Sequence, residues 1–285
     1  MGLKKFCLVL SASCVLTLAL DSWADDSVTT GVSTEVSKKN TLQKIREKTQ
    51  LLYWSMLFGP GFNSKPNQTL NGDGEATQGG LFHMLWTGYK LNDRDAIGVL
   101  SRFSQDFKTV ENGEVLNGTF EMRDPRLYWR RSNWIDNSIL NYTHEARVEI
   151  PTTARAREEQ RNTVLQSVHI FNFKPKNKNL SIGIFNAVTH TWNKDDSSFL
   201  NFATGPYATY TLNPKWSIYA WTWFDVDHRL TSPFGSFDYA DADYLRIGPM
   251  YSPVPNVQLY PCVQVYTFNP QWNTSTVGFE LSAQL

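Results

Sequence analysis

The sequence predicts an all-β fold, an antiparallel transmembrane β-barrel of about 12 strands with a short N-terminal segment that is partly helical. Three observations support this prediction. The segment Ser275–Leu285 alternates strictly between apolar and polar residues, other segments of similar length follow it, and the connections between segments alternate between tight and long. Successive side chains of a strand point to opposite faces, so such segments have one apolar face and one polar face.

Residues 1–24 have the features of a secretory signal peptide. Two lysines precede the apolar run Phe6–Leu20, and a Ser-Trp-Ala sequence ending at Ala24 provides a small-x-small cleavage site. The apolar run is shorter than the about 20 residues that a membrane-spanning helix needs. We therefore expect a mature chain that begins at Asp25. Cleavage before Cys14, as in a lipoprotein, is the alternative.

The segment 25–50 is polar and is expected to be a periplasmic or lumen-entering extension. Leu42 and Ile45 share one face of a short predicted helix, for which Asn40 or Thr41 is the N-cap. This helix either lies loosely before the barrel or enters its lumen as a plug. After the leader, the chain has no run of about 18 apolar residues, which excludes a helical membrane protein.

The barrel is expected to comprise residues 51–285. Several of its strand segments are about ten residues long, which is the length that a tilted strand needs to cross a bilayer. The strands are predicted at Leu51–Gly59, Leu81–Leu91, Ala96–Phe107, Phe120–Arg131, Ile139–Ile150, Val164–Phe173, Leu180–Trp192, Phe199–Leu212, Trp216–Asp227, Asp241–Tyr251, Val257–Tyr266 and Ser275–Leu285.

The connections between these segments fall into two alternating classes. The tight class is Asn92–Asp95, Ser132–Asn137, Lys174–Asn179, Asn213–Lys215 and Ser252–Asn256. The other class is longer on average and rich in Gly, Asn and acidic residues: Pro60–Gly80, Asp106–Gly118, Pro151–Asn162, Asn193–Ser198, His228–Ala240 and Thr267–Thr274. Short periplasmic turns and long extracellular loops are typical of outer-membrane barrels. A secreted β-sandwich, the alternative all-β fold, has no reason to keep this alternation.

The closing strand Ser275–Leu285, behind a secretory leader, resembles the closing strand of Gram-negative outer-membrane β-barrel proteins of the porin-like type. Those proteins usually end in an aromatic residue, where this chain has Leu285. The resemblance covers nearly all of the mature chain and indicates no subfamily. It implies location in the outer membrane, contact with lipid and lipopolysaccharide, and recognition of the last strand by the barrel assembly machinery.

Composition excludes some classes of protein. The chain has 27 basic and 27 acidic residues, so nothing indicates nucleic-acid binding. Cys262 is the only cysteine after the leader, so it cannot form an internal disulfide and is expected to be a small wall residue. No cofactor is expected. Aromatic residues near strand ends are expected to form interfacial girdles: Trp54, Trp86, Trp129, Trp192, Trp216, Trp272, Tyr89, Tyr210 and Tyr251.

The alternation also assigns charged side chains to the lumen, where we expect them to set ion selectivity: Arg102, Arg126, Arg130, Glu145, Arg147, Glu149, Arg246 and Glu280. Four of these arginines come from three consecutive strands, and guanidinium groups bind carboxylates and phosphates through a bidentate fork. The alternative is a packed lumen in which the glutamates neutralise the arginines. The registers of Val164–Phe173 and Trp216–Asp227 stay open, because both faces of each mix polar and apolar residues.

These features predict a passive channel for small polar or anionic solutes. The alternative is a non-conducting barrel that displays the loops Pro60–Gly80 and Asp106–Gly118 for adhesion or complex formation.

A third hypothesis is an outer-membrane hydrolase, with no catalytic residue assigned. Serine needs a base to become nucleophilic, and His144, His169 and His190 lie on strands near Ser167 and Ser181. However, the Asn-His-x-Ser pattern of outer-membrane phospholipases is missing, and alternation places His144 on the lipid-facing side.

Four acids at one pair of strand ends, Asp225, Asp227, Asp241 and Asp243, are a candidate rim for a divalent cation. They lack the Asp-x-His spacing of omptin-like proteases, and a solvated acidic loop base is the alternative.

Overall fold

The protein is described by a computed structural model. The described residues are 47–61, 69–70, 76–77, 80–106, 109–111, 114–116, 120–194, 198–229, 238–239, 243–266 and 276–284. The predicted leader, most of the predicted N-terminal extension with its helix, and Asp241 lie outside them. The barrel strands belong to one compact unit, Gln50–Leu285.

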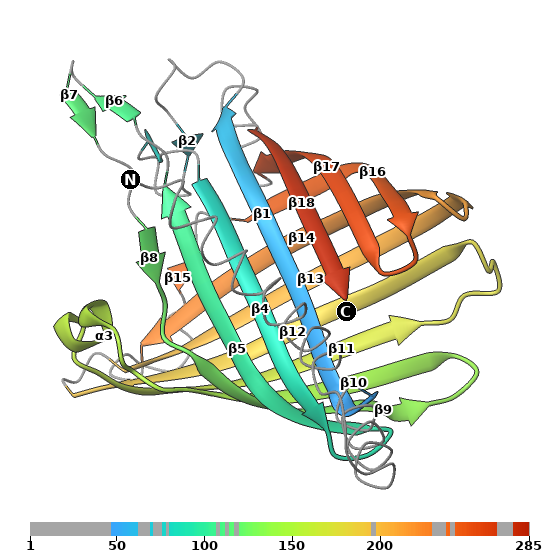
Figure 1. Ribbon diagram of the computed structural model, residues 1–285, viewed down its shortest axis with the longest axis horizontal. Coiled ribbons are helices and arrows are strands. Elements are labelled where there is room, and N and C mark those ends of the chain that lie inside the picture. The colour runs from blue at the N-terminus through green and yellow to red at the C-terminus, as the bar shows by residue number, and fades with distance from the viewer. Residues whose placement is uncertain are drawn as a thin grey trace, which may run out of the picture. The chain divides into compact units, whose positions relative to one another are not determined.

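Twelve antiparallel strands close into a barrel, as the sequence predicts (Figure 1). Each strand pairs with its neighbours in the chain, and the first strand pairs with the last. The strands are β1 (Thr49–Gly61), β4 (Gly80–Lys90), β5 (Asp95–Asp106), β9 (Arg126–Asp136), β10 (Leu140–Glu149), β11 (Arg161–Phe173), β12 (Leu180–Asn193), β13 (Phe199–Asn213), β14 (Trp216–Arg229), β16 (Tyr244–Val254), β17 (Val257–Tyr266) and β18 (Thr276–Gln284).

Short additional elements lie in the long connections. β2 (Thr69–Leu70) pairs with β3 (Ala76–Thr77), β6 (Thr109–Glu111) with β7 (Glu114–Leu116), β8 (Phe120–Met122) with β5, and β15 (Asp238–Tyr239) with β14. Helix α3 (Ala154–Glu158) occupies the connection between β10 and β11. Helix α3 and β15 lie at one end of the barrel, and the tight turns after β11 and β16 lie at the other (Figure 1). No helix in the described ranges is long and apolar enough to cross a membrane.

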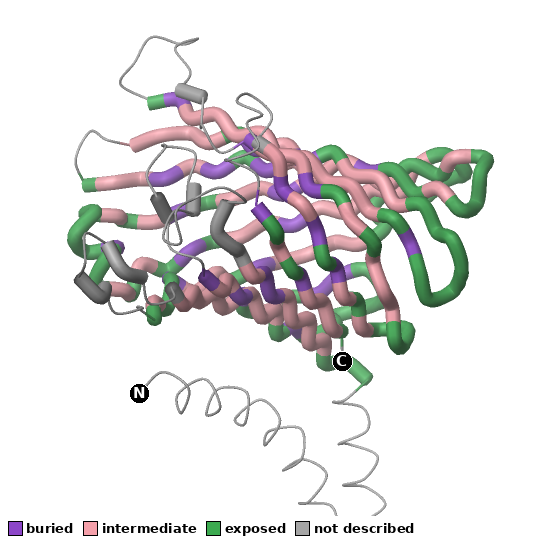
Figure 2. The backbone as a smooth tube through the Cα atoms, turned by 90° about the horizontal axis from the view of Figure 1, so that it is seen from above, coloured by how far each residue is buried: buried purple, intermediate pink, exposed green. Residues whose placement is uncertain are grey.

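The two faces of the barrel wall have opposite polarity. On β10, Val148 is 41% exposed, whereas Glu145 and Glu149 on the other face are only 1% and 2% exposed. The closing strand follows the same rule, because Val277 and Phe279 are exposed while Glu280 is buried. Buried residues recur along the strands, and exposed residues gather at the turns (Figure 2). An apolar outer face with polar residues inside is the pattern of a membrane barrel.

Two predicted boundaries on the fourth strand are wrong. The segment Phe120–Arg131 is not continuous: β8 ends at Met122 and β9 begins at Arg126, after Pro125, which has no N–H to donate to a ladder. The predicted turn Ser132–Asn137 is mostly strand. Asn133 has a positive φ of 53°, and the pairing with β10 shifts register beside it, so a bulge lengthens β9 to Asp136.

Helix α3 is a further difference, because the sequence reading placed only a loop at Pro151–Asn162. Thr153 is its N-cap, and the hydroxyl of this residue accepts a hydrogen bond from the N–H of Ala156 at 3.2 Å. Gln160, with φ of 51°, follows the C-cap and ends the helix in the left-handed conformation that is common there.

Candidate functional site in the barrel lumen

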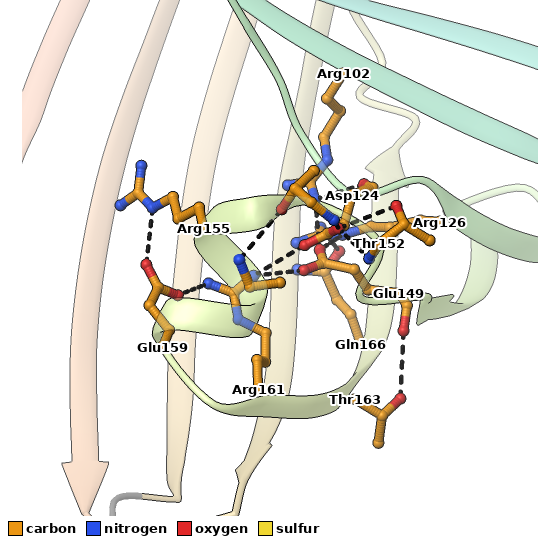
Figure 3. A network of polar contacts seen from close by, with 12 residues as sticks. Arg102, Asp124, Arg126, Glu149, Thr152, Arg155, Glu159, Arg161, Thr163 and Gln166 are labelled. Atoms are coloured by element: carbon orange, nitrogen blue, oxygen red, sulfur yellow. Dashed lines mark hydrogen bonds and ion pairs between the residues drawn. The ribbon is translucent and has the colours of Figure 1, made fainter.

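Glu149, at the end of β10, is the centre of a group of arginines on the inner face of the barrel (Figure 3). Its carboxylate accepts hydrogen bonds from Arg126 Nε at 2.8 Å, from Arg161 Nη1 at 2.7 Å and from Arg102 Nη2. The three arginines come from β9, β11 and β5. The pairing of Glu149 with Arg126 across β9 and β10 brings these side chains together.

Glu145, four residues before Glu149 on the same face of β10, is a second centre. It accepts hydrogen bonds from Arg130 Nε at 2.6 Å and from Arg147 Nε. Gln166 connects the two centres, because its Oε1 accepts from Arg126 Nη1 at 3.0 Å and from Arg147 Nη1 at 2.8 Å. We call Arg102, Arg126, Arg130 and Arg147, with Glu145 and Glu149, the arginine network.

The arginine network is not electrically balanced. Counted with Arg161, which pairs with Glu149, Glu159 and Asp124, the group has five arginines and four carboxylates, so one positive charge is in excess. Removing charges from water is costly unless they are paired and hydrogen-bonded, so Glu145 and Glu149 keep the guanidinium groups on this face. The side chains of the four arginines are 11–25% exposed on the inner face. Guanidinium groups in such positions have the chemistry to bind carboxylate or phosphate groups.

Arg130 is held by an aromatic neighbour as well. Its guanidinium lies 5.6 Å from the ring centroid of Tyr128, which is 5% exposed. Gly88 and Gly98 face each other on β4 and β5, and a Cβ on either would come within 2.7 Å of the Tyr128 hydroxyl. These glycines leave the space in which the ring supports Arg130.

Asp124, between β8 and β9, is a site residue that the sequence reading missed. Its Oδ1 accepts hydrogen bonds from the backbone N–H groups of Thr152 at 2.6 Å and Thr153 at 2.7 Å, and its carbonyl accepts from Arg102 Nη2 at 3.2 Å. Burial raises the pKa of the Asp124 carboxyl, but these backbone hydrogen bonds outweigh it and hold the pKa below its ordinary value. Asp124 thus ties the loop before α3 to the arginine network.

Glu159 connects α3 to the same group. It accepts a hydrogen bond from Arg155 Nε at 2.7 Å and pairs with Arg161. Burial raises the pKa of the Glu159 carboxyl, but the hydrogen bonds and charges of Arg155 and Arg161 have the larger effect. The pKa of this carboxyl therefore lies below its ordinary value. Arg161 therefore joins Glu149 inside the barrel to Glu159 at the end of the helix.

A cavity of about 320 Å³ lies against this part of the wall. Five arginines and four acidic residues line it: Arg102, Arg123, Arg126, Arg155, Arg161, Glu121, Asp124, Glu149 and Glu159. Arg123 is exposed and stacks 5.5 Å from the ring centroid of Phe82, without an ion pair among the described residues. The cavity places guanidinium groups at the end of the barrel that carries α3.

The other two predicted lumen residues, Arg246 and Glu280, lie apart from the arginine network on the β14–β18 side of the barrel. Arg246 Nη1 donates to Glu280 Oε1 at 2.9 Å, and Arg246 Nε donates to Gln264 Oε1 at 2.7 Å. Its guanidinium faces the rings of Tyr244 and Trp221, with centroids at 4.3 and 5.4 Å. In this group, which we call the Arg246 cluster, Arg246 pairs with Glu280 among the described residues, beside aromatic rings.

The predicted acidic rim comes together only in part. Asn201 Nδ2 donates to Asp227 at 2.8 Å and also to Asp225, and the N–H of Asp225 donates to Asp243 Oδ1 at 2.9 Å. Asp241 lies outside the described residues. Within the described ranges, no group of three or more His, Cys, Asp or Glu residues is placed to hold a metal ion. The carboxylates here accept hydrogen bonds from amide groups of the wall.

Comparison with known proteins gives the fold. No protein-family model and no curated protein matches the sequence. Among solved structures, the chain is similar to an outer membrane channel from Pseudomonas putida F1, with a TM-score of 0.54 and 10% identity over 84% of this chain and 95% of that one. The NanC porin gives a TM-score of 0.47 and 9% identity over 81% and 97%. LpxR from Salmonella typhimurium gives 0.38 and 10% over 82% and 99%. The chain therefore has the fold of outer-membrane β-barrel proteins.

Proposed function

We propose that the protein is a passive channel in the outer membrane of a Gram-negative bacterium, and that it admits small polar solutes with a preference for anions. The observation that carries this proposal is the excess of arginines over carboxylates on this part of the inner face, five against four when Arg161, Asp124 and Glu159 are counted with the arginine network. Guanidinium groups fixed along a pore lower the energy of an anion there and raise that of a cation.

The geometry of the network supports the same function. The side chains of Glu145 and Glu149 are 1% exposed, whereas those of the four arginines are 11–25% exposed. The carboxylates thus lie behind the guanidinium groups, so a solute in the lumen meets positive charge first. The cavity beside Arg102, Arg126 and Arg161 provides an entry for a carboxylate or phosphate group, which arginine binds through two parallel hydrogen bonds.

One specific observation favours a second candidate, a non-conducting barrel that displays its loops. Inward-facing apolar residues of the wall are tightly packed: Leu100 and Val168 are 0% exposed, and Ala187 and Ala203 pack against Val168. A lumen filled at this level would block passage of solutes and leave the long connections as the functional surface.

Single-channel conductance separates the two candidates. The refolded chain is inserted into a planar bilayer under a gradient of potassium chloride. We expect discrete current steps, with a reversal potential whose sign shows that chloride is more permeant than potassium. A barrel that inserts stably and gives no steps contradicts the channel and favours the loop-displaying alternative. Steps with cation preference would contradict the assigned role of the arginine network.

A further inference from the structure

A cluster of polar side chains lies on the outer face of the barrel, away from the lumen. It consists of Tyr142 and His144 on β10 and Ser167 and His169 on β11, and we call it the outer-face cluster. These residues alternate with the inward-facing Glu145 and Gln166. The surface around them is apolar and open: Leu127, Val148 and Leu165 are 48%, 41% and 42% exposed.

The outer-face cluster is a continuous chain of hydrogen bonds. Ser167 Oγ lies 3.0 Å from His144 Nε2 and 3.0 Å from His169 Nε2. His169 Nδ1 lies 2.8 Å from the hydroxyl of Tyr142. Strand register produces this arrangement, because His144 is paired with His169 and Ala146 with Ser167. One hydroxyl therefore contacts two imidazoles, and the second imidazole has a partner behind it.

The environment selects the direction of these hydrogen bonds. His144 Nδ1 is buried and has no hydrogen-bond partner among the residues that the structure describes. A buried N–H without an acceptor is costlier than a buried lone pair, so the proton of a neutral His144 resides on Nε2 and is donated to Ser167 Oγ. Ser167 then donates its own proton to His169 Nε2, and His169 Nδ1–H donates to Tyr142. In this state His169 is the base for Ser167, and Tyr142 fixes its tautomer.

Aromatic rings place the outer-face cluster at the edge of the membrane's hydrocarbon layer. The ring of Tyr142 stacks on Phe171 and on Trp134, with centroids at 4.8 and 6.1 Å, and the ring of His144 lies 5.8 Å from Trp129. Trp and Tyr on the outer face of a barrel settle at the level of lipid headgroups. Acyl-ester carbonyls of lipids lie beside that level, within reach of Ser167.

Polar groups on a lipid-facing surface are costly and mark functional positions. We infer that Ser167 is the nucleophile of an esterase site on the outer wall of the barrel, with His169 as its base, and that the substrate is the acyl ester of a membrane phospholipid. This inference rests on the proposed membrane location and is independent of whether the lumen conducts. A nucleophile, a base within hydrogen-bond distance and a third group that orients the base form the arrangement required for acyl transfer.

The reaction balances with water as the only co-reactant. Ser167 Oγ attacks the ester carbonyl carbon as its proton passes to His169 Nε2, while the hydrogen bond from His144 Nε2–H orients Ser167 Oγ. The ester C–O bond breaks, and the lysophospholipid alcohol leaves with the proton from His169. Water then attacks the acyl-serine carbonyl while His169 accepts its proton. His169 returns this proton to Ser167 Oγ as the acyl C–O bond breaks, and fatty acid and free Ser167 result.

The test compares wild type with Ser167→Ala in vesicles of phosphatidylethanolamine and phosphatidylglycerol. The measured quantity is fatty acid released per barrel, with insertion checked by vesicle flotation and heat-modifiable migration on gels. The matched control is Ser101→Ala, which removes a hydroxyl from the outer face of β5, where Ser101 is paired with Leu85. Ser167→Ala is expected to reduce release to background, and Ser101→Ala to leave it unchanged.

Two further measurements keep the test decisive if Ser167→Ala folds poorly. His169→Ala is expected to reduce fatty acid release by about 100-fold or more, and Tyr142→Phe by a smaller factor, because it only orients the base. A fluorophosphonate probe is expected to label wild type at Ser167 and not at Ser101. Equal release by inserted wild type and Ser167→Ala, including none from either, overturns the proposal. A chain that does not enter vesicles overturns the membrane location and this site with it.

Discussion

The arginine network and the Arg246 cluster are built from the same residue types on the inner face of one barrel, but they differ in charge balance and exposure. In the Arg246 cluster one arginine meets one glutamate, and Arg246 is 2% exposed between aromatic rings. In the arginine network and its neighbour Arg161, five arginines meet four carboxylates, and a cavity lies against Arg102 and Arg126. The charges of the Arg246 cluster neutralise each other, whereas the arginine network is expected to leave positive charge that a solute can contact.

The difference shows that an inward-facing arginine is not by itself a selectivity residue. Alternation along a strand assigns Arg246 and Arg130 to the same face, yet one is enclosed by Glu280, Gln264 and aromatic side chains and the other is partly open. Function depends on how many carboxylates the neighbouring strands supply. The Arg246 cluster is accordingly expected to stabilise the barrel, and the arginine network to set its selectivity.

The largest expected effect is on stability, from Arg246→Met. This change leaves the Glu280 carboxylate buried without its partner, which typically costs about 3–5 kcal/mol of unfolding free energy. Unfolding of the barrel in detergent by guanidinium chloride measures this loss of unfolding free energy. The double variant Arg246→Met with Glu280→Gln is expected to recover most of it, since no unpaired charge remains. Wild-type stability in the single variant would show that the pair is dispensable.

A second prediction concerns ion selectivity and uses Arg126→Gln combined with Arg130→Gln. Glu149 keeps Arg102 and Arg161, and Glu145 keeps Arg147, so each buried carboxylate remains paired while the network loses two positive charges. The reversal potential in a salt gradient is expected to move from the anion-selective value towards zero.

The matched control for this selectivity prediction is Arg94→Gln, which removes one charge from an exposed turn outside the lumen. It is expected to leave the reversal potential unchanged. An unchanged reversal potential in the Arg126→Gln, Arg130→Gln variant would instead show that the arginine network does not set ion selectivity.

Much of the fold follows from short-range pattern. Alternation locates all twelve strands and assigns the inner face of β10, because a strand that divides lipid from a polar interior must carry opposite residues on its two faces. It does not predict pairs between distant residues. Asp124 meets Thr152 and Thr153, 28 and 29 positions later, and no local pattern marks that contact.

The register between neighbouring strands could not be predicted from the sequence, and it determines the contacts on the inner and outer faces of the barrel. The contact between His144 and Ser167 depends on the alignment of β11 with β10, and β11 has mixed polarity on both faces, so its alignment stayed open in the sequence. The bulge at Asn133 shifts the β9–β10 pairing in the same region. These alignments determine which arginine pairs with which glutamate. They therefore also determine the charge balance of the lumen.

The smallest expected effect is a pH dependence at the edge of the arginine network, through Asp124. The pKa of this carboxyl is lowered in the folded protein, so its stabilising contribution is present above the ordinary Asp pKa of about 4 and is lost as pH falls through the lower folded value. Asp124→Asn keeps an acceptor for the Thr152 and Thr153 N–H groups but removes the charge. We expect wild type to exceed this variant by about 1 kcal/mol in unfolding free energy at pH 7. This difference in unfolding free energy should narrow towards pH 3.

Asp93→Asn, in the exposed turn before β5, is the matched control and should show no such difference from wild type. A gap that stayed constant from pH 7 to pH 3 would mean that geometry, and not the charge of Asp124, holds α3 against the arginine network.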